Sequence, residues 1–271
     1  MKATPQDRLV AQLFFSAAFP VMKVVLQENE KFRKTWENVQ AVVQFRGKDE
    51  DGDIVCHLVF DNGDFKVVQG ECEGKVDMEL YFNSISKMVK MFKGSLTSLP
   101  DMSSLMKALF KTPKLLVNTL MLLMQLMLMM PTSEPKDDLQ KYLKVKMSLY
   151  MITTALSVAN KLGWEGISGW TKNQPDRIYQ FITGDLNNPD VACYFRVKQG
   201  KSKAGRGVYE RKNPFVLFHF TSIDGALTML KKEKEFVKCV EDGEAQVIGA
   251  PEYGVQFNDI MAVLQDMLTK I

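Results

Sequence analysis

Two stretches of the chain, LYFNSISKMVKMFK (Leu80–Lys93) and FHFTSIDGALTMLK (Phe218–Lys231), share one pattern that decides the fold. Each begins with an apolar run typical of a strand, continues with a serine suited to cap a helix, and ends in apolar residues at helical spacing. Farther upstream, VVQFRG (Val42–Gly47) matches IYQFITG (Ile178–Gly184). These paired stretches predict a duplicated α+β unit with the order helix, four strands, helix, short strand, helix.

A polar hinge, PTSEPKDD, lies at residues 131–138 between the two copies. The 271 residues are enough for two domains of ordinary size. We therefore expect a first domain over residues 1–131 and a second over residues 132–271, with the first the more divergent. Each is expected to hold a mostly antiparallel sheet of about five strands covered by helices.

The first copy predicts helices over residues 6–32, kinked or divided at Pro20. Residues 41–82 alternate with the period of strands and include a hairpin turn at Asn62-Gly63. A fifth strand is expected in SLTSLP at residues 95–100.

The second copy predicts a helix over residues 136–162, followed by a loop that holds Trp164 and Trp170. Four strands then end at Phe220, and one long helix is expected over residues 223–242. A fifth strand, AQVIGAP, precedes a closing helix with a wide apolar face.

Between the copies lies LLVNTLMLLMQLMLMM (Leu115–Met130), which is apolar around its whole circumference and must be covered on every side if helical. Its sixteen residues are fewer than the roughly 20 that cross a bilayer. It is expected to be a buried helix, as core or as the wall of a lipid cavity, since its methionines adapt to irregular neighbours. A membrane span is the less favoured alternative.

Composition excludes several classes of protein. The net charge is only +3, so charge gives no indication of nucleic-acid binding. The four cysteines lack CxxC spacing, which argues against a zinc site or a disulfide framework. The N-terminal MKATPQDRLVAQLFFSAAFPVM imitates a signal peptide, but a packed first helix explains the same residues, and we expect a cytoplasmic location.

The sequence lacks recognisable catalytic and cofactor motifs. The chain has two histidines, His57 and His219, both inside strand patterns and both expected to be structural. It contains no GxSxG, no GxGxxG after a strand and no GxxxxGK[ST], and the acidic run Asp49–Asp53 lacks calcium-loop spacing and is expected to be a solvated turn. The sequence therefore predicts no enzyme, no metal and no cofactor.

The repeated unit resembles the sterol carrier protein type 2 family, a small α+β lipid-binding domain whose sheet and helices enclose an apolar tunnel. The resemblance is clearest over residues 190–271 and includes the GEAQVIG strand; in the first copy it covers roughly residues 41–100. The first copy departs from the family by its all-round apolar helix and a basic amphipathic one. The resemblance implies two sheet-and-helix units. The departures leave two alternatives: both units keep an open tunnel, or one unit has closed its tunnel to support the other.

The leading hypothesis is a non-enzymatic carrier that binds a fatty acyl chain, an isoprenoid or a polycyclic lipid. A structural or regulatory interaction protein with a filled core is the alternative, and an acyl-group enzyme is disfavoured because no nucleophile pair is present. The residues expected to bind lipid are Leu120, Leu123, Met124, Met127, Phe218, Phe220, Leu227, Leu230, Phe236, Met261, Leu264 and Leu268.

A carrier must exchange its ligand with a membrane, and two groups of cations could contact an anionic surface. The groups are Lys107, Lys111 and Lys114, and Lys201, Lys203 and Arg206. The first lies beside an amphipathic helix whose apolar stripe either packs on its own domain or touches a membrane. The second lies in a basic hairpin that either protects a sheet edge or attracts headgroups or a coenzyme phosphate.

Overall fold

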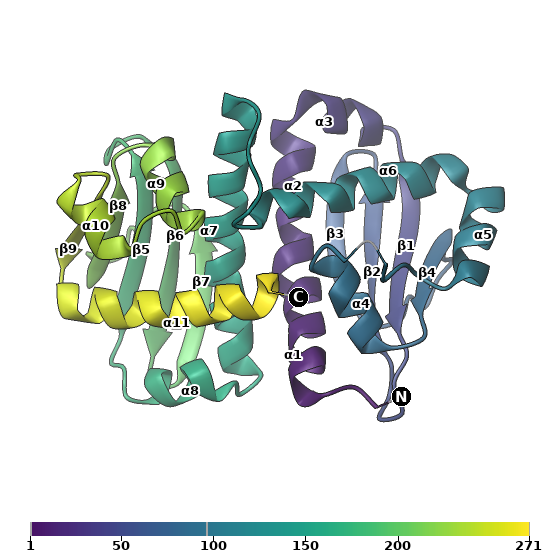
Figure 1. Cartoon of the computed structure of the whole chain (residues 1–271), viewed down its shortest axis with the longest axis horizontal. Coiled ribbons are helices and arrows are strands. Elements are labelled where there is room, and N and C mark those ends of the chain that lie inside the picture. The colour runs from purple at the N-terminus through teal and green to yellow at the C-terminus, as the bar shows by residue number, and fades with distance from the viewer. Residues whose placement is uncertain (1, 96, 271) are drawn as a thin grey trace. The chain divides into compact units, whose positions relative to one another are not determined.

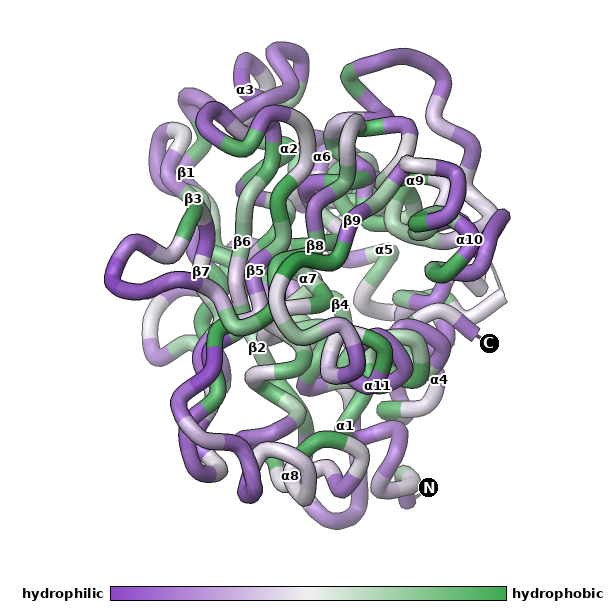
Figure 2. Tube along the Cα trace, turned by 90° about the vertical axis from the view of Figure 1, so that its left-hand side faces the viewer, coloured by the Kyte–Doolittle hydropathy of each residue, from purple (hydrophilic) through white to green (hydrophobic). Residues whose placement is uncertain are grey.

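The computed structural model describes residues 2–95 and 97–270. These divide into two compact units, the first running up to Met127 and including the chain from Leu268, the second spanning Leu128–Met267 (Figure 1). Hydrophobic residues concentrate in the strands and helices and hydrophilic residues in the connecting loops (Figure 2).

The first unit places a four-stranded sheet among helices. Its strands are β1 (Gln40–Gly47), β2 (Ile54–Asp61), β3 (Asp64–Gln69) and β4 (Met78–Phe82). Its helices are α1 (Pro5–Leu13), the π-helical turn η1 (Phe14–Ala18), α2 (Phe19–Glu28), α3 (Glu30–Trp36), α4 (Ile85–Phe92), α5 (Met102–Lys111), α6 (Pro113–Met124) and the 3₁₀ turn η2 (Gln125–Met129).

The second unit has a five-stranded sheet. Its strands are β5 (Arg177–Gly184), β6 (Pro189–Lys198), β7 (Lys201–Arg206), β8 (Val216–Phe220) and β9 (Ala245–Gly249). Its helices are α7 (Asp138–Lys161), α8 (Glu165–Lys172), α9 (Ile223–Leu230), α10 (Phe236–Glu241) and α11 (Pro251–Thr269). In Figure 1, α11 (yellow) crosses in front of this sheet.

The two sheets share one topology over four strands, and the second sheet has the additional edge strand β9. The strand orders are β3-β2-β1-β4 and β7-β6-β5-β8-β9. In each sheet one neighbouring pair is parallel, β1 with β4 and β5 with β8, and every other pair is antiparallel. The predicted α+β class with mostly antiparallel sheets is therefore confirmed.

Two buried glutamines occupy the same place in the two sheets. Gln44 accepts a hydrogen bond from the backbone N–H of Cys72 (2.9 Å), and Gln180 accepts one from the backbone N–H of Tyr209 (2.9 Å). Both side chains thus fasten the loop that follows the third strand of the unit. A polar group buried at this position is tolerated because it is hydrogen-bonded.

The fifth strand predicted at residues 95–100 is wrong. The described residues Ser95 and Thr97–Pro100 form no strand, while Leu96 lies outside the described residues. Instead, the start of α5 covers the exposed edge of β4. The backbone N–H of Asp101 donates to the carbonyl of Tyr81 (2.8 Å), and the N–H of Tyr81 donates to Oγ of Ser104 (3.3 Å). These bonds satisfy the edge groups that a fifth strand would otherwise use.

Pro20 divides the first helical run, as predicted. Proline lacks the backbone N–H that would bond one turn back and its ring crowds that carbonyl, and the wider π-helical turn η1 directly precedes the helix that carries it. The run Pro5–Glu28 is long and apolar enough to cross a membrane, and 72% of its most apolar window is buried. A core helix of a soluble protein and a signal sequence both pass that test.

The long helix predicted over residues 223–242 is divided into α9 and α10. Lys232 adopts a left-handed backbone conformation (φ 59°), and the N–H of Glu233 bonds to the carbonyl of Thr228 (3.1 Å). This is the hydrogen-bond pattern of a helix C-terminus closed by a left-handed residue. The charged run between Lys231 and Glu235 therefore forms a turn.

Three further expectations need correction. Leu115–Met130 is not one fully covered helix, because α6 passes into the 3₁₀ turn η2 and leaves Val117, Met121 and Met124 exposed. The segment holding Trp164 and Trp170 contains helix α8 in place of a loop. The helix predicted from residue 136 begins at Asp138, capped by the carboxylate of Asp137, which accepts from the N–H of Gln140 (2.8 Å).

Candidate ligand-binding cavity

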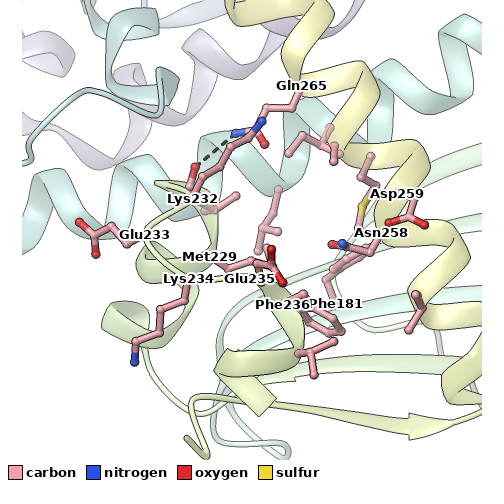
Figure 3. A pocket seen from close by; sticks show the side chains of 17 residues that line it. Phe181, Met229, Lys232, Glu233, Lys234, Glu235, Phe236, Asn258, Asp259 and Gln265 are labelled. Atoms are coloured by element: carbon pink, nitrogen blue, oxygen red, sulfur yellow. Dashed lines mark hydrogen bonds between the residues drawn. The ribbon is translucent and has the colours of Figure 1, made fainter. Parts of the chain in front are cut away.

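The second unit has a cavity of about 550 Å³ between its sheet and its helices, open to solvent on one side (Figure 3). Its lining comes from α7, β5, α9, α10, α11 and the turn between α9 and α10. The volume lies within the range of about 300–1,000 Å³ that is typical of small-molecule sites. The cavity is therefore the principal candidate for a binding site in this unit.

The inner wall of the cavity is apolar. It consists of buried side chains from four helices and one strand, namely Leu149, Ile152, Phe181, Leu230, Phe236 and Met261. Phe181 stacks on Phe218 (ring centroids 4.8 Å apart), which fixes the orientation of its ring. Such a wall favours a ligand with a substantial apolar part.

The mouth of the cavity is polar and is formed by the turn that divides α9 from α10. Lys232 forms an ion pair with Asp266, and Lys234 bridges Asp242 (2.8 Å) and Glu244 (2.6 Å). Hydrogen bonds to those two carboxylates raise the pKa of Lys234. Both lysines at the mouth are thus neutralised by neighbouring acids.

Two other carboxylates at the mouth are differently placed. Glu235 and Asp259 line the cavity, and neither has an ion pair among the described residues. In Figure 3 the carboxylate of Glu235 and the amide of Asn258 point toward one another across the pocket. The charge left uncompensated at the mouth is therefore negative.

The predicted lipid-binding residues fall into three groups. Leu230, Phe236 and Met261 line the cavity. The second group is buried but does not line it: Phe218, Phe220, Leu227, Leu264 and Leu268. The third group lies in α6 and η2 of the first unit: Leu120, Leu123, Met124 and Met127. Met124 is 66% exposed, so the expectation that this group forms an enclosed wall is wrong at that residue.

Sequence reasoning missed the contribution of α7 and the polar mouth. Leu149 and Ile152 line the cavity from α7, and Lys232–Glu235 lie at its mouth. No local signal indicated that turn, because the lysines and glutamates of the run KKEKE favour a helix.

In the first unit, a phenylalanine stands where Leu230 stands in the second. The matched stretches place Phe92 at the end of α4 and Leu230 at the end of α9. The ring of Phe92 contacts those of Phe14, Phe15, Phe19, Phe45 and Phe82, with centroid distances of 5.1–6.2 Å. An aromatic cluster thus fills the space between sheet and helices around this position.

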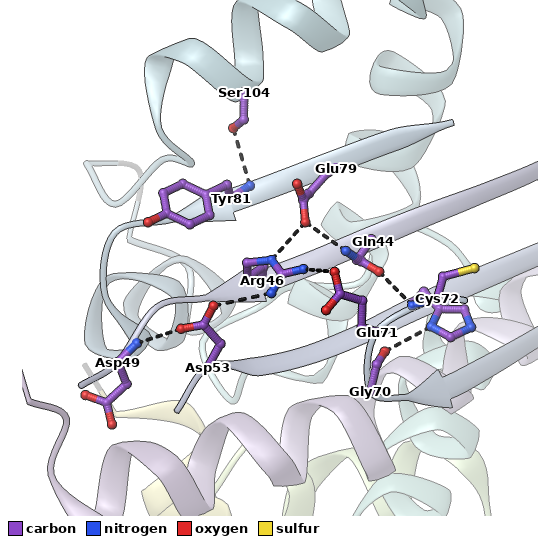
Figure 4. A network of polar contacts seen from close by, with 11 residues as sticks. Gln44, Arg46, Asp49, Asp53, Gly70, Glu71, Cys72, Glu79, Tyr81 and Ser104 are labelled. Atoms are coloured by element: carbon purple, nitrogen blue, oxygen red, sulfur yellow. Dashed lines mark hydrogen bonds and ion pairs between the residues drawn. The ribbon is translucent and has the colours of Figure 1, made fainter. Parts of the chain in front are cut away.

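The first unit also has a pocket, of about 340 Å³, lined by β1, β4, α5 and the segment between β3 and β4. Arg46 lines this pocket and forms the ion-pair network of Figure 4. Its guanidinium contacts Glu79 (3.0 Å), Asp53 (3.3 Å) and Glu71. Burial alone lowers the pKa of Arg46, but the hydrogen bonds to these carboxylates outweigh it and raise the pKa. Arg46 lies on β1, whereas Asp53 and Glu71 lie in loops, so the ion pairs connect these loops to the sheet. We therefore interpret the network as structural.

The remaining candidates have structural contacts. His57 Nδ1 contacts the carbonyl of Gly70 (3.0 Å), and His219 Nε2 contacts that of Gly184 (2.8 Å). Asp49 is buried, against the expectation of a solvated turn: it accepts from the N–H of Ala3 (2.7 Å) and pairs with Arg8, which lower its pKa. Residues 2–95 and 97–270 contain no group of three or more histidine, cysteine or acidic side chains placed to hold a metal.

The predicted membrane-contacting cations occupy two surfaces. Lys107 and Lys111 lie on α5 and Lys114 at the start of α6. Lys201, Lys203 and Arg206 lie on β7, where Arg206 stacks over the ring of Tyr150 (4.9 Å).

Comparison with known proteins gives little. No family model and no curated protein matches the chain. Among solved structures, a stereoselective inverting sec-alkylsulfatase from Pseudomonas sp. matches 65% of this chain at 9% identity and a TM-score of 0.27. The chain spans 31% of that protein's length. A similarity this weak carries no argument about function.

Proposed function

We propose that this chain is a non-enzymatic carrier that holds an apolar ligand in the cavity of its second unit. The observation that supports the proposal is the apolar cavity wall between the sheet and the helices of the second unit. In the first unit, the ring of Phe92 occupies the corresponding space. The sequence of the same unit most clearly resembles the sterol carrier protein type 2 family. Membership of that family and a cytoplasmic location stay predictions.

The proposal is tested by giving the second unit the side chain of the first. Leu230→Phe adds a ring at the cavity wall, so it should reduce the bound ligand at least about tenfold with little loss of stability. The measurement is solvent extraction of the purified full chain followed by mass spectrometry, together with titration of added dodecanol. Leu186→Phe, the same change at an exposed loop position of this unit, is the matched control and should bind like the wild type.

Two outcomes would contradict the proposal. One is a wild-type protein that yields no lipid and does not bind dodecanol. The other is a fall of about 1–3 kcal/mol in the unfolding free energy of Leu230→Phe, which would mean that the site is a densely packed core.

The second candidate is a structural or regulatory interaction protein. The observation that favours it is the filled aromatic cluster of the first unit, since a unit without a ligand can still present a surface. Absence of ligand together with stable capture of a protein partner by the purified chain would favour this candidate over the carrier.

A further inference from the structure

Helix α5 in the first unit packs on the sheet through its small residues. Ala108 is buried, and Oγ of Ser104, one turn earlier, accepts the hydrogen bond from the N–H of Tyr81. Because α5 covers the edge of β4, this narrow side must lie close to backbone, which favours serine and alanine there. The larger apolar residues therefore lie on the opposite side of the helix.

The apolar side of α5 faces solvent. Phe110 is 77% exposed and Met102 69% exposed, and Met106 and Leu109 between them are also exposed. At about 100° per residue these four positions lie within an arc of roughly 100°, rotated away from Ser104 and Ala108. The sequence pattern allowed the stripe either to pack on its own domain or to touch a membrane, and in the structure Met102 and Phe110 are mostly exposed while Met106 and Leu109 are about half exposed.

The charge carried by this helix and the start of the next is positive, and Lys107 and Lys111 line a pocket together with Glu71, Asp77 and Glu79. Residues 102–133 contain three lysines, Lys107, Lys111 and Lys114, and no acidic residue. None of the three has an ion pair within residues 2–95 and 97–270. The cations of β7 have no comparable apolar stripe beside them, and nearby Asp176 pairs with Arg196 and Lys212.

From this arrangement we infer that α5 is a membrane-docking helix. Its Met102, Met106, Leu109 and Phe110 enter the headgroup and acyl boundary of an anionic bilayer, and Lys107, Lys111 and Lys114 contact the phosphates and carboxylates of the headgroups. The exposed apolar stripe matches the acyl boundary of a bilayer, and the three exposed lysines of residues 107–114 match its anionic headgroups. The inference does not depend on the cavity of the second unit.

The test is co-sedimentation of the full chain with phosphatidylcholine vesicles, with and without about 30 mol per cent phosphatidylserine. The wild type should bind the anionic vesicles at least about tenfold more strongly, and the binding should weaken as salt screens the charges. Phe110→Glu, and separately the triple change Lys107→Glu, Lys111→Glu and Lys114→Glu, should each lower partitioning about tenfold.

Two matched controls locate the effect. Val263→Glu changes an apolar residue that is 57% exposed on α11, and the triple change Lys201→Glu, Lys203→Glu and Arg206→Glu reverses the other cationic group. Both should partition within about twofold of the wild type. Insertion is measured directly with Phe110→Trp, whose added fluorescence should shift to the blue with anionic vesicles, whereas that of Val263→Trp should not.

Three results would overturn the inference. Equal binding to neutral and anionic vesicles would remove the role of the lysines, and unchanged binding of Phe110→Glu would remove that of the stripe. A third result is a wild type that does not bind vesicles but associates with itself or with another protein. If Phe110→Glu abolishes that association, a protein covers this face of α5. A melting curve unchanged from the wild type establishes that each variant is folded.

Discussion

Phe92 and Leu230 show how one side chain can separate two units of the same topology. Both end the helix that follows the parallel strand of the sheet, and both are buried. Phe92 joins five other rings, whereas Leu230 borders open volume. The matched stretches align these residues in the sequence, but both are apolar and suit a core equally. Which unit retains space depends on the summed volume of side chains from several helices, which no local pattern contains.

At the same scale, Lys144 is a lysine with no exposed surface on α7. Its Nζ donates to the carbonyls of Met130 (2.9 Å) and Ser133 (2.6 Å). Burial, together with the positive charge of Lys231, lowers the pKa of Lys144 to about 8 against the opposing charges of Glu134 and Glu233. The folded protein therefore releases this proton at a lower pH than the unfolded chain does.

This shift predicts a pH dependence of stability. Between pH 8 and the ordinary lysine value, the unfolded state binds the proton and the folded state does not, so the free energy of unfolding rises with pH. The wild-type value minus that of Lys144→Met should increase by about 2 kcal/mol from about pH 7.5 to 9.5, measured by urea unfolding.

The control is Lys141→Met on the same helix. The ion pair with Asp224 raises the pKa of Lys141 (Nζ to Oδ1 2.9 Å), so it stays charged in both states and its difference from the wild type should stay flat. A flat difference for Lys144→Met as well would mean that this amine is solvated in the folded protein.

At the scale of elements, local sequence signals predicted the strands and most helix starts. Ser84 and Ser222 accept from the backbone N–H of Lys87 (3.2 Å) and Gly225 (3.0 Å), as their positions before apolar helical runs indicate. The turn between α9 and α10 was missed because its residues fit a helical period, and helical propensity is a weak guide where a left-handed residue ends the helix. The replacement of a fifth strand by α5 was missed because edge coverage depends on tertiary contacts.

That turn leads to a prediction about the ligand's head group. With Lys232 and Lys234 paired, the uncompensated charges at the mouth are Glu235 and Asp259. An anionic head would be repelled there, whereas an amine or hydroxyl can donate a hydrogen bond. Dodecylamine and dodecanol should therefore bind more tightly than dodecanoate, by about tenfold for the amine.

Calorimetric titration of the three compounds at equal salt provides the measurement. Glu235→Gln with Asp259→Asn should reduce the preference for the amine, while Glu241→Gln, a change on α10 outside the cavity lining, should leave it unchanged. If dodecanoate binds best, the head-group prediction is wrong and the carrier proposal stands. If none of the three binds, the carrier proposal itself fails.

At the scale of the whole molecule, each unit has its own sheet and its own aromatic core. Trp36 stacks on Phe60 in the first unit (3.8 Å between centroids) and Tyr179 on Phe257 in the second (4.4 Å). A unit that buries its own apolar side chains should fold without the other. The two units differ in structure: the second has a cavity, and the first turns one apolar side of a helix to solvent.

The boundary of the second unit is set by Lys144, and this gives the last prediction. A fragment of residues 128–271 keeps both carbonyls that accept from Nζ of Lys144, whereas a fragment of residues 136–271 loses both and keeps the Asp137 cap of α7. The longer fragment should unfold cooperatively and retain the cavity. The shorter should be less stable by about 2 kcal/mol, since hydrogen bonds from a charged group are worth about 1.5–3 kcal/mol each and truncation lets water replace part of that.

The same truncation made in the Lys144→Met background isolates the contact from other effects of removing residues 128–135, such as loss of the exposed ion pair between Glu134 and Lys231. If the carbonyls hold the amine, truncation should cost about 1–2 kcal/mol less in that background, because the partner is already absent. Equal costs in the two backgrounds would show that Lys144 does not depend on residues 130–133. The unit would then begin at α7 itself.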